Sequence, residues 1–161
     1  MTLSGHQHIV YCLAFNNPFG DLIATGSFDK TARIWETSTG ECKNILKGHT
    51  GEIVGLTFDS HAQLLATGSM DTTARLWDVE TGQELSVLKG HTGEVIGLNF
   101  SSEGDLIVTA SFDGTAKVWD IKTGKSINTL DEHTAELSNV TFDFTADYIA
   151  TSSLDKYVLL I

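Results

Sequence analysis

A repeat of 42 residues constrains this chain more than any other feature. Four tetrapeptides with Ser first and Asp third place their aspartates 42 residues apart, at Asp29, Asp71, Asp113 and Asp155. The same step separates the tryptophans and three of the histidines, at Trp35, Trp77, Trp119, His49, His91 and His133. His6 lies one residue further away because the stretch 16–20 carries a single insertion. A period of this length is typical of stacked supersecondary units that bury their faces against one another.

Each repeat has the pattern of four short strands. In the second unit we expect strands at 53–58, 64–69, 73–77 and 84–88, separated by turns that contain Asp or Gly. The first of these runs is nearly continuous in its apolar character and the third alternates, whereas no stretch has an apolar period of 3.6 residues. The sequence therefore predicts an all-β fold in one array, with units at about 5–47, 48–89, 90–131 and 132–161.

Four-stranded units that carry a Gly-His pair and a Trp-Asp pair resemble the WD-repeat family. Gly48-His49 and Trp77-Asp78 are the pairs of the second unit, and the resemblance extends over residues 5–160. It implies a β-propeller in which each unit supplies three strands of one blade and the outer strand of its predecessor.

The recurring polar residues could also suggest a Ser-His-Asp hydrolase triad. Repetition favours a structural role, because an active site needs one copy and this set occurs in three full copies and one incomplete copy. The resemblance implies a buried hydrogen-bond chain from Trp77 through a strand hydroxyl to His49 and Asp71. We choose Ser69 as that hydroxyl, with Thr67 on the same strand face as the alternative. The predicted tetrads are His6, Ser27, Asp29 and Trp35; His49, Ser69, Asp71 and Trp77; His91, Ser111, Asp113 and Trp119; and His133, Ser153 and Asp155, with Ile161 in the place of the tryptophan.

A candidate partner face can be located from the repeat. The residue before each turn aspartate is large and apolar, and a glutamate follows three of the four histidines by three residues, with Ile9 in that place in the first unit. The resemblance implies that both sets emerge at one face, near the central channel. An apolar row beside carboxylates would suit a protein with apolar anchors and basic flanks; the alternative is that each apolar residue packs against its neighbouring blade. The residues of this face are Phe28, Met70, Phe112, Leu154, Glu52, Glu94 and Glu136.

Composition limits the kinds of partner. Ten Lys and Arg against 21 Asp and Glu give a net charge of −11, which disfavours nucleic acid and favours a basic protein. No apolar run approaches the roughly 20 residues that span a bilayer, so we expect no membrane partner. Cys12 and Cys42 are expected to be reduced thiols of a cytoplasmic protein, and His8 and His61 to be surface residues. We expect no catalytic residue, no cofactor and no metal site.

The array also predicts unpaired flanks. No outer strand precedes residues 3–6, and the stretch 156–161 lacks the Thr, the basic residue and the Trp that the first unit has there. We expect a partial propeller of about four blades, the last incomplete, as a fragment of a seven- or eight-bladed ring. Alternatively, two chains could complete one ring of eight through their open edges.

Some stretches resemble a narrower group, the dynein assembly factors with WD repeats. The similar segments are 14–21, 23–31, 66–74 and 135–138. This resemblance implies a non-catalytic adaptor that supports axonemal outer-arm dynein assembly and its intraflagellar transport, with axonemal dynein subunits and transport components as partners. It also implies a place in the cytoplasm and in the cilium or flagellum, including basal body and axoneme. The alternatives are a ubiquitin-ligase substrate receptor or a G-protein-β-like signalling module.

Overall fold

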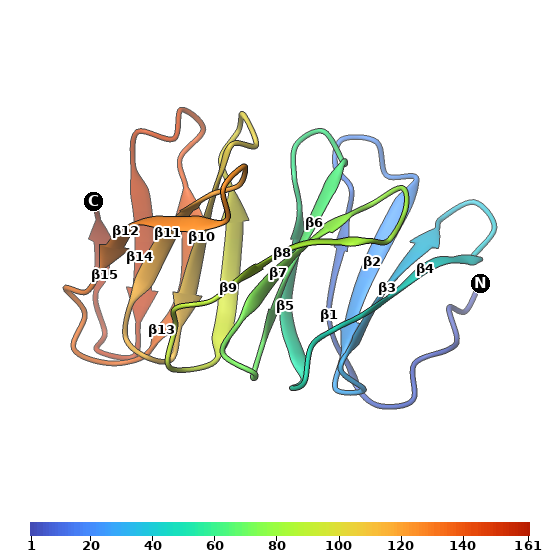
Figure 1. The fold of residues 1–161 in the computed structure, drawn as a ribbon, viewed down its shortest axis with the longest axis horizontal. Coiled ribbons are helices and arrows are strands. Elements are labelled where there is room, and N and C mark those ends of the chain that lie inside the picture. Colours follow the sequence, from blue (N-terminus) through green and yellow to red (C-terminus); the bar gives the residue numbers. More distant parts are fainter.

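The computed structural model describes all residues, 1–161, and contains β-strands and no helix. The strands form four antiparallel sheets that stand side by side, with the N- and C-termini at opposite ends of the row (Figure 1). The strands are β1 (Val10–Phe15), β2 (Leu22–Ser27), β3 (Thr31–Glu36), β4 (Cys42–Lys47), β5 (Ile53–Phe58), β6 (Leu64–Ser69), β7 (Ala74–Asp78), β8 (Glu84–Leu88), β9 (Val95–Phe100), β10 (Leu106–Ser111), β11 (Ala116–Asp120), β12 (Lys125–Leu130), β13 (Leu137–Phe142), β14 (Ile149–Ser153) and β15 (Val158–Leu160).

Each sheet is a simple meander. The first three sheets have the orders β1-β2-β3-β4, β5-β6-β7-β8 and β9-β10-β11-β12, and the fourth has three strands, β13-β14-β15. The inner strands β1, β5, β9 and β13 neighbour one another in sequence order, so the sheets are successive blades of a partial β-propeller. No helix is long and apolar enough to cross a membrane.

The strands follow the predicted pattern with two differences. In the second unit, β5, β6 and β8 have the predicted bounds, but the third strand extends from Ala74 to Asp78 rather than from Thr73 to Trp77. Thr73 belongs to the turn, because its amide donates to Asp71 Oδ1 at 3.0 Å. The second difference concerns where a unit begins. Units numbered from 5–47 coincide with whole sheets, because β4 pairs with β3 of its own sheet. A unit that begins at β4 supplies the outer strand of one blade and three strands of the next, as the resemblance implies.

The hydrophobic core lies between the blades. At the first junction one cluster joins the inward side of blade 1 to blade 2 through Ala24, Ala32, Ile34, Leu46, Ile53, Phe58, Leu65, Trp77 and Val79. Two further clusters occupy the other junctions. Neighbouring blades approach closely: a Cβ on Gly68 of β6 would lie 2.6 Å from the carbonyl oxygen of Val95 on β9, so only glycine fits there. Stability therefore depends on contacts between neighbouring blades.

Candidate functional site

A buried hydrogen-bond chain connects the strands and turns of each blade. In blade 2 the indole Nε1 of Trp77 donates to Thr67 Oγ1 at 2.9 Å. Thr67 Oγ1 also lies 2.8 Å from His49 Nε2, and His49 Nδ1 lies 2.8 Å from Asp71 Oδ2. The Thr50 amide donates to the same carboxylate oxygen at 2.9 Å. This hydrogen-bond chain thus links β6 and β7 to the loop before β5.

The same hydrogen-bond chain recurs along the array. Blades 1 and 3 repeat it with distances within 0.1 Å of those in blade 2. The fourth blade keeps His133, Thr151 and Asp155 but has no indole donor. At the tryptophan position Ile161 makes only backbone bonds, to Ile149. The structure therefore brings the predicted His, Asp and Trp residues of each set together.

The predicted serine hydroxyls are not part of the chain to tryptophan. The acceptors are instead Thr25, Thr67 and Thr109, with Thr151 in the fourth blade. Trp77 stands opposite Leu65, so Thr67 is its diagonal neighbour on the same sheet face, whereas Ser69 lies two residues further along. Ser69 Oγ accepts the Asp71 amide at 3.0 Å and holds the turn. Ser27, Ser111 and Ser153 make the same turn contact.

The ionisation of the network follows from burial and hydrogen bonding. Burial lowers the pKa of His49 more than its contact with Asp71 raises it, and the same holds for His91 beside Asp113. Burial alone would raise the pKa of Asp71, but hydrogen bonds from Thr73, Thr50 and His49 hold it well below its usual range. A neutral imidazole beside a carboxylate must donate through Nδ1, so Nε2 accepts the Thr67 hydroxyl. The donors therefore run in one direction, from Trp77 to Asp71.

The network is closed to a substrate. Ser69 and Thr67 are fully buried, and the side chain of His49 is fully buried as well. No group of three or more His, Cys, Asp or Glu side chains could hold a metal ion. His8 and His61 are exposed at the surface. The geometry assigns the repeated polar residues to fixing turns against strands.

The predicted partner face lies at the turns β2–β3, β6–β7, β10–β11 and β14–β15, along the lower edge of the array in Figure 1. Met70, Phe112 and Leu154 are 43%, 45% and 62% exposed. Each is paired with one of the predicted glutamates, because its amide donates to the carbonyl of Glu52, Glu94 or Glu136 at 2.9 Å. The structure thus places the apolar residue and the glutamate of each of these blades side by side.

Phe28 is different from the other three turn residues. Its amide donates to the Ile9 carbonyl, where the other blades have glutamate. Its ring stacks on Tyr11 with a centroid distance of 5.4 Å and on His8 at 6.1 Å, and it is only half-buried. The first blade therefore ends the row with a group of aromatic rings.

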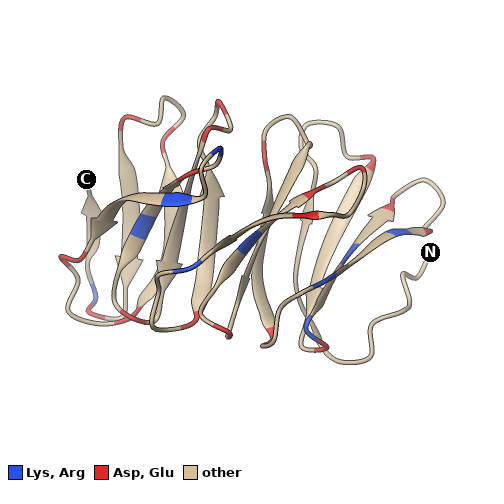
Figure 2. Ribbon diagram, in the orientation of Figure 1, with Lys and Arg blue, Asp and Glu red and all other residues tan.

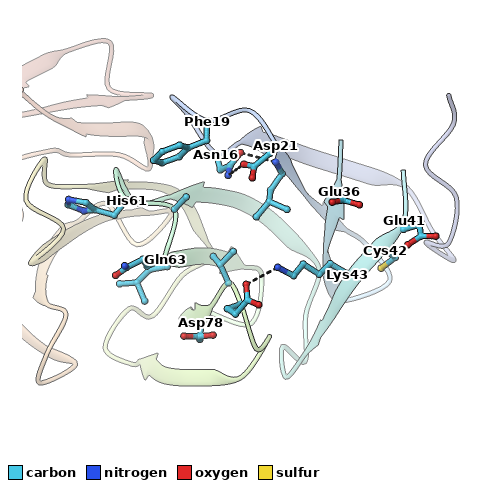
Figure 3. A pocket seen from close by; sticks show the side chains of 15 residues that line it. Asn16, Phe19, Asp21, Glu36, Glu41, Cys42, Lys43, His61, Gln63 and Asp78 are labelled. Carbon is cyan, nitrogen blue, oxygen red and sulfur yellow. Dashed lines mark hydrogen bonds and ion pairs between the residues drawn. The ribbon is translucent and has the colours of Figure 1, made fainter. Parts of the chain in front are cut away.

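A pocket of about 800 Å³ lies between blades 1 and 2 at the opposite end of the strands. It is formed by residues at and beside the loops β1–β2, β3–β4, β5–β6 and β7–β8 (Figure 3). These loops lie along the upper edge of the array in Figure 1, away from the predicted partner face. Leu22, Leu64 and Val79 form an apolar wall, and Phe19 is exposed beside them. Strand β4 is tied to the next blade here, because Asn44 Nδ2 donates to the Val79 carbonyl at 3.0 Å.

The charge of this pocket is negative. Five carboxylates line it, Asp21, Glu36, Glu41, Asp78 and Glu80, against the single amino group of Lys43. Lys43 is already paired with Glu80 at 2.8 Å. Asp and Glu residues gather at the ends of the blades, whereas several Lys and Arg lie along strands (Figure 2). Sequence reasoning missed this pocket; the one signal was the insertion at 16–20, which lengthens the loop that forms one wall.

Comparison with known protein families decides the classification. The WD domain, G-beta repeat family matches residues 1–36, 40–78, 82–120 and 124–161. The chain belongs to the WD-repeat family. Each internal WD match runs from the outer strand of one blade through three strands of the next, which explains its offset from the sheets.

Individual WD-repeat relatives match over shorter stretches. The chain is 40% identical over 62 residues to WD repeat-containing protein pop1 of Schizosaccharomyces pombe, 38% of this chain and 8% of the relative. It is 42% identical over 57 residues to Nuclear distribution protein PAC1-1 of Uncinocarpus reesii, 35% of this chain and 13% of the relative. It is 41% identical over 56 residues to Ribosome assembly protein 4 of Chaetomium thermophilum, 35% of this chain and 11% of the relative.

The chain therefore matches only a small part of each of these WD-repeat relatives. These relatives share the WD repeat with this chain, and their names differ from one another. WD-repeat proteins generally act as non-catalytic scaffolds for protein interactions.

Proposed function

We propose that this chain is a non-catalytic scaffold that captures a protein partner on the turn face formed by Met70, Phe112 and Leu154 with their neighbouring glutamates. The observation that carries this proposal is the exposure of three large apolar side chains on successive rigid turns. Apolar groups held in water by a fixed backbone favour burial against a partner. Glutamates beside them attract basic groups, so the partner has apolar anchors with Lys or Arg around them.

For the identity of the partners we propose axonemal dynein subunits and components of intraflagellar transport, in the cytoplasm and the cilium or flagellum. The support is the resemblance of segments 14–21, 23–31, 66–74 and 135–138 to the dynein assembly factors with WD repeats. The relatives named above do not bear on this choice.

Affinity capture from ciliated cells tests both parts. The bait is compared with a variant that carries Met70→Ser, Phe112→Ser and Leu154→Ser. The matched control carries Ile45→Ser, Leu85→Ser and Ile127→Ser, which are exposed apolar residues of the outer strands β4, β8 and β12. We expect the bait and the control to capture dynein-arm and transport subunits, and the turn variant to lose them.

Two outcomes would contradict the proposal in different ways. Full capture by the turn variant, with an unchanged melting temperature, would remove the turn face as the binding surface. Capture of ubiquitin-ligase or signalling subunits in place of dynein-arm subunits would contradict the proposed partners and leave the turn face intact.

A further inference from the structure

The pocket between blades 1 and 2 lies where the loop β1–β2 stands apart from the next blade. At the junction of blades 2 and 3 the equivalent loops are joined, because Ser60 Oγ donates to the Ser102 carbonyl at 2.8 Å. No hydrogen bond joins residues 16–21 of blade 1 to residues 59–63 of blade 2. The longer loop of blade 1 therefore leaves this junction open at the blade ends.

The loop β1–β2 is held in one conformation by Asn16. This residue is only 2% exposed, and its Oδ1 accepts the Leu22 amide at 2.9 Å while its Nδ2 donates to Asp21 Oδ1 at 2.6 Å. Phe19, which lies between these ends of the loop, is 61% exposed beside the pocket. A fixed loop thus holds an apolar ring in water, so a ligand meets a preformed edge and little ordering cost opposes binding.

Apolar and acidic side chains are interleaved around the pocket. Val79 lies between Asp78 and Glu80 in the sequence, and Leu22 directly follows Asp21. The apolar wall is the outward side of the junction core, because Leu22 packs against the buried cluster that contains Val79. A ligand that enters this pocket therefore meets apolar surface and carboxylates together.

Most of the negative charge of the pocket has no counter-ion. Of the five carboxylates only Glu80 forms an ion pair, with Lys43, so four negative charges remain. Glu36 and Glu41 are exposed and lie at the opposite end of the pocket from Phe19 (Figure 3). The pocket therefore attracts a cationic ligand, whereas it repels nucleic acid and anionic lipid.

We propose that this pocket is a second docking site, which binds a segment of a partner protein that contains both arginine and large apolar side chains. The ion pair of Lys43 with Glu80 shows how an alkyl cation lies here, since its stem leaves β4 of blade 1 and its ammonium reaches blade 2. An arginine of the partner lays its stem along the apolar wall and brings its guanidinium to the unpaired carboxylates. The apolar neighbours of that arginine pack on the wall and on Phe19.

A protein segment is favoured as the occupant over a small cation. The volume of about 800 Å³ exceeds what one side chain fills, and a hydrated ion would leave the apolar wall unused. No group of side chains here could hold a metal ion. The pocket and the turn face lie at opposite edges of the blades, so one chain can hold two proteins at once.

Isothermal titration calorimetry with the capped peptide Leu-Arg-Arg-Leu tests the site. We expect saturable binding at low salt, and weaker binding when citrulline, which has the shape of arginine without its charge, replaces both arginines. Replacement of both leucines with serine should also weaken binding, because the apolar wall then has no partner. Bound peptide should protect Cys42, which lines the pocket, from a neutral thiol reagent.

Charge variants with opposite expected effects locate the peptide in the pocket. Glu36→Gln combined with Glu41→Gln, at two exposed side chains, should raise the dissociation constant about fivefold. Lys43→Gln frees Glu80 for the peptide and should lower the dissociation constant. A rise in the dissociation constant on Lys43→Gln would contradict recognition of the peptide by these carboxylates.

Two further variants separate this pocket from the turn face. Phe19→Ser should raise the dissociation constant, whereas Phe144→Ser, at an exposed ring of the loop β13–β14, is the matched control and should leave it unchanged. The turn variant with Met70→Ser, Phe112→Ser and Leu154→Ser should bind the peptide as the wild-type chain does. No saturable binding, equal affinity for the citrulline peptide, or binding that is lost only in the turn variant would overturn the proposal.

Discussion

The Trp77 indole Nε1 donates to Thr67 Oγ1 at 2.9 Å, and both residues are buried. This bond crosses diagonally from β7 to β6 and continues through His49 to Asp71. Because the first donor is an indole N–H and the last acceptor is a carboxylate, each of these four side chains has a partner for its polar groups. The unit of stabilisation is therefore the whole set of four residues.

Removal of the Thr67 hydroxyl leaves both the Trp77 indole and His49 Nε2 without a partner. We expect Thr67→Val, which keeps the shape, to lower the free energy of unfolding by about 1–3 kcal/mol. Thr151→Val is the matched control, because Thr151 contacts only His133 and no indole. We expect Thr151→Val to lower the free energy of unfolding, measured by urea denaturation, by less than Thr67→Val does. Equal costs for the two variants would contradict the role of the indole bond.

Acid should destabilise the chain in two steps. The pKa of His49 and His91 is lowered in the folded state from 6.5, so the unfolded chain binds more protons and stability falls as the pH drops below about 6.5. The pKa of Asp113 is lowered to about 2 and that of Asp71 is lowered in the same direction, so a second loss occurs between about pH 4 and pH 2.

Melting temperatures at pH 7.5, 5.5 and 3 follow both steps of this acid destabilisation. His91→Gln should weaken the first step, and His61→Gln, at an exposed ring, should leave it unchanged. A melting temperature that is constant from pH 7.5 to pH 5.5 would show that the histidines do not change protonation on unfolding.

The turn between the second and third strands of each blade has one residue in a left-handed conformation. This residue is Lys30, Thr72, Gly114 or Lys156, with φ between 70° and 84°. A β-branched residue is strained there by about 1–2 kcal/mol, whereas glycine adds about 0.5–1 kcal/mol of unfolded-chain entropy. Because the strain exceeds this entropy, Thr72→Gly should raise the free energy of unfolding by about 0.5–1 kcal/mol. Gly114→Thr should lower it, and a stabilising Gly114→Thr would refute the argument.

The repeat made much of this fold predictable. Three of the four strand ranges in the second unit were correct because Asp and Gly residues bound them. The choice between Ser69 and Thr67 could not be decided from alternation, since both lie on one strand face; the diagonal position of Trp77 decides it. The pocket between blades 1 and 2 was not predictable either, because it depends on how loops from two blades face each other. The exposure of Met70 and Leu154 likewise required the packing of neighbouring blades.

The electrostatic potential of that pocket can be measured at a natural thiol. Cys42 is exposed and lines the pocket, whereas burial raises the pKa of Cys12 to about 12 and leaves it unreactive at neutral pH. The rate of modification of Cys42 by each methanethiosulfonate reagent is divided by the rate of the same reagent with a free thiol. We expect this ratio to be several-fold higher for a cationic reagent than for an anionic one.

Added salt and two substitutions check the origin of this preference. Salt should reduce the ratio of the two rates, because it screens the exposed carboxylates. The double substitution Asp78→Asn with Glu41→Gln should reduce the ratio of the two rates further. The control Asp147→Asn, at a residue of the last blade, should leave this ratio unchanged. Equal rates for both reagents in the wild-type chain would contradict a negative pocket.

Exchange of the three indole N–H protons with solvent, followed by NMR, tests the central claim most directly. If Trp35, Trp77 and Trp119 are structural donors to Thr25, Thr67 and Thr109, all three indole protons exchange far more slowly than a free indole. If any of the three exchanges at the free rate in the folded chain, that tryptophan faces solvent and the assignment of the repeated residues to structure is wrong.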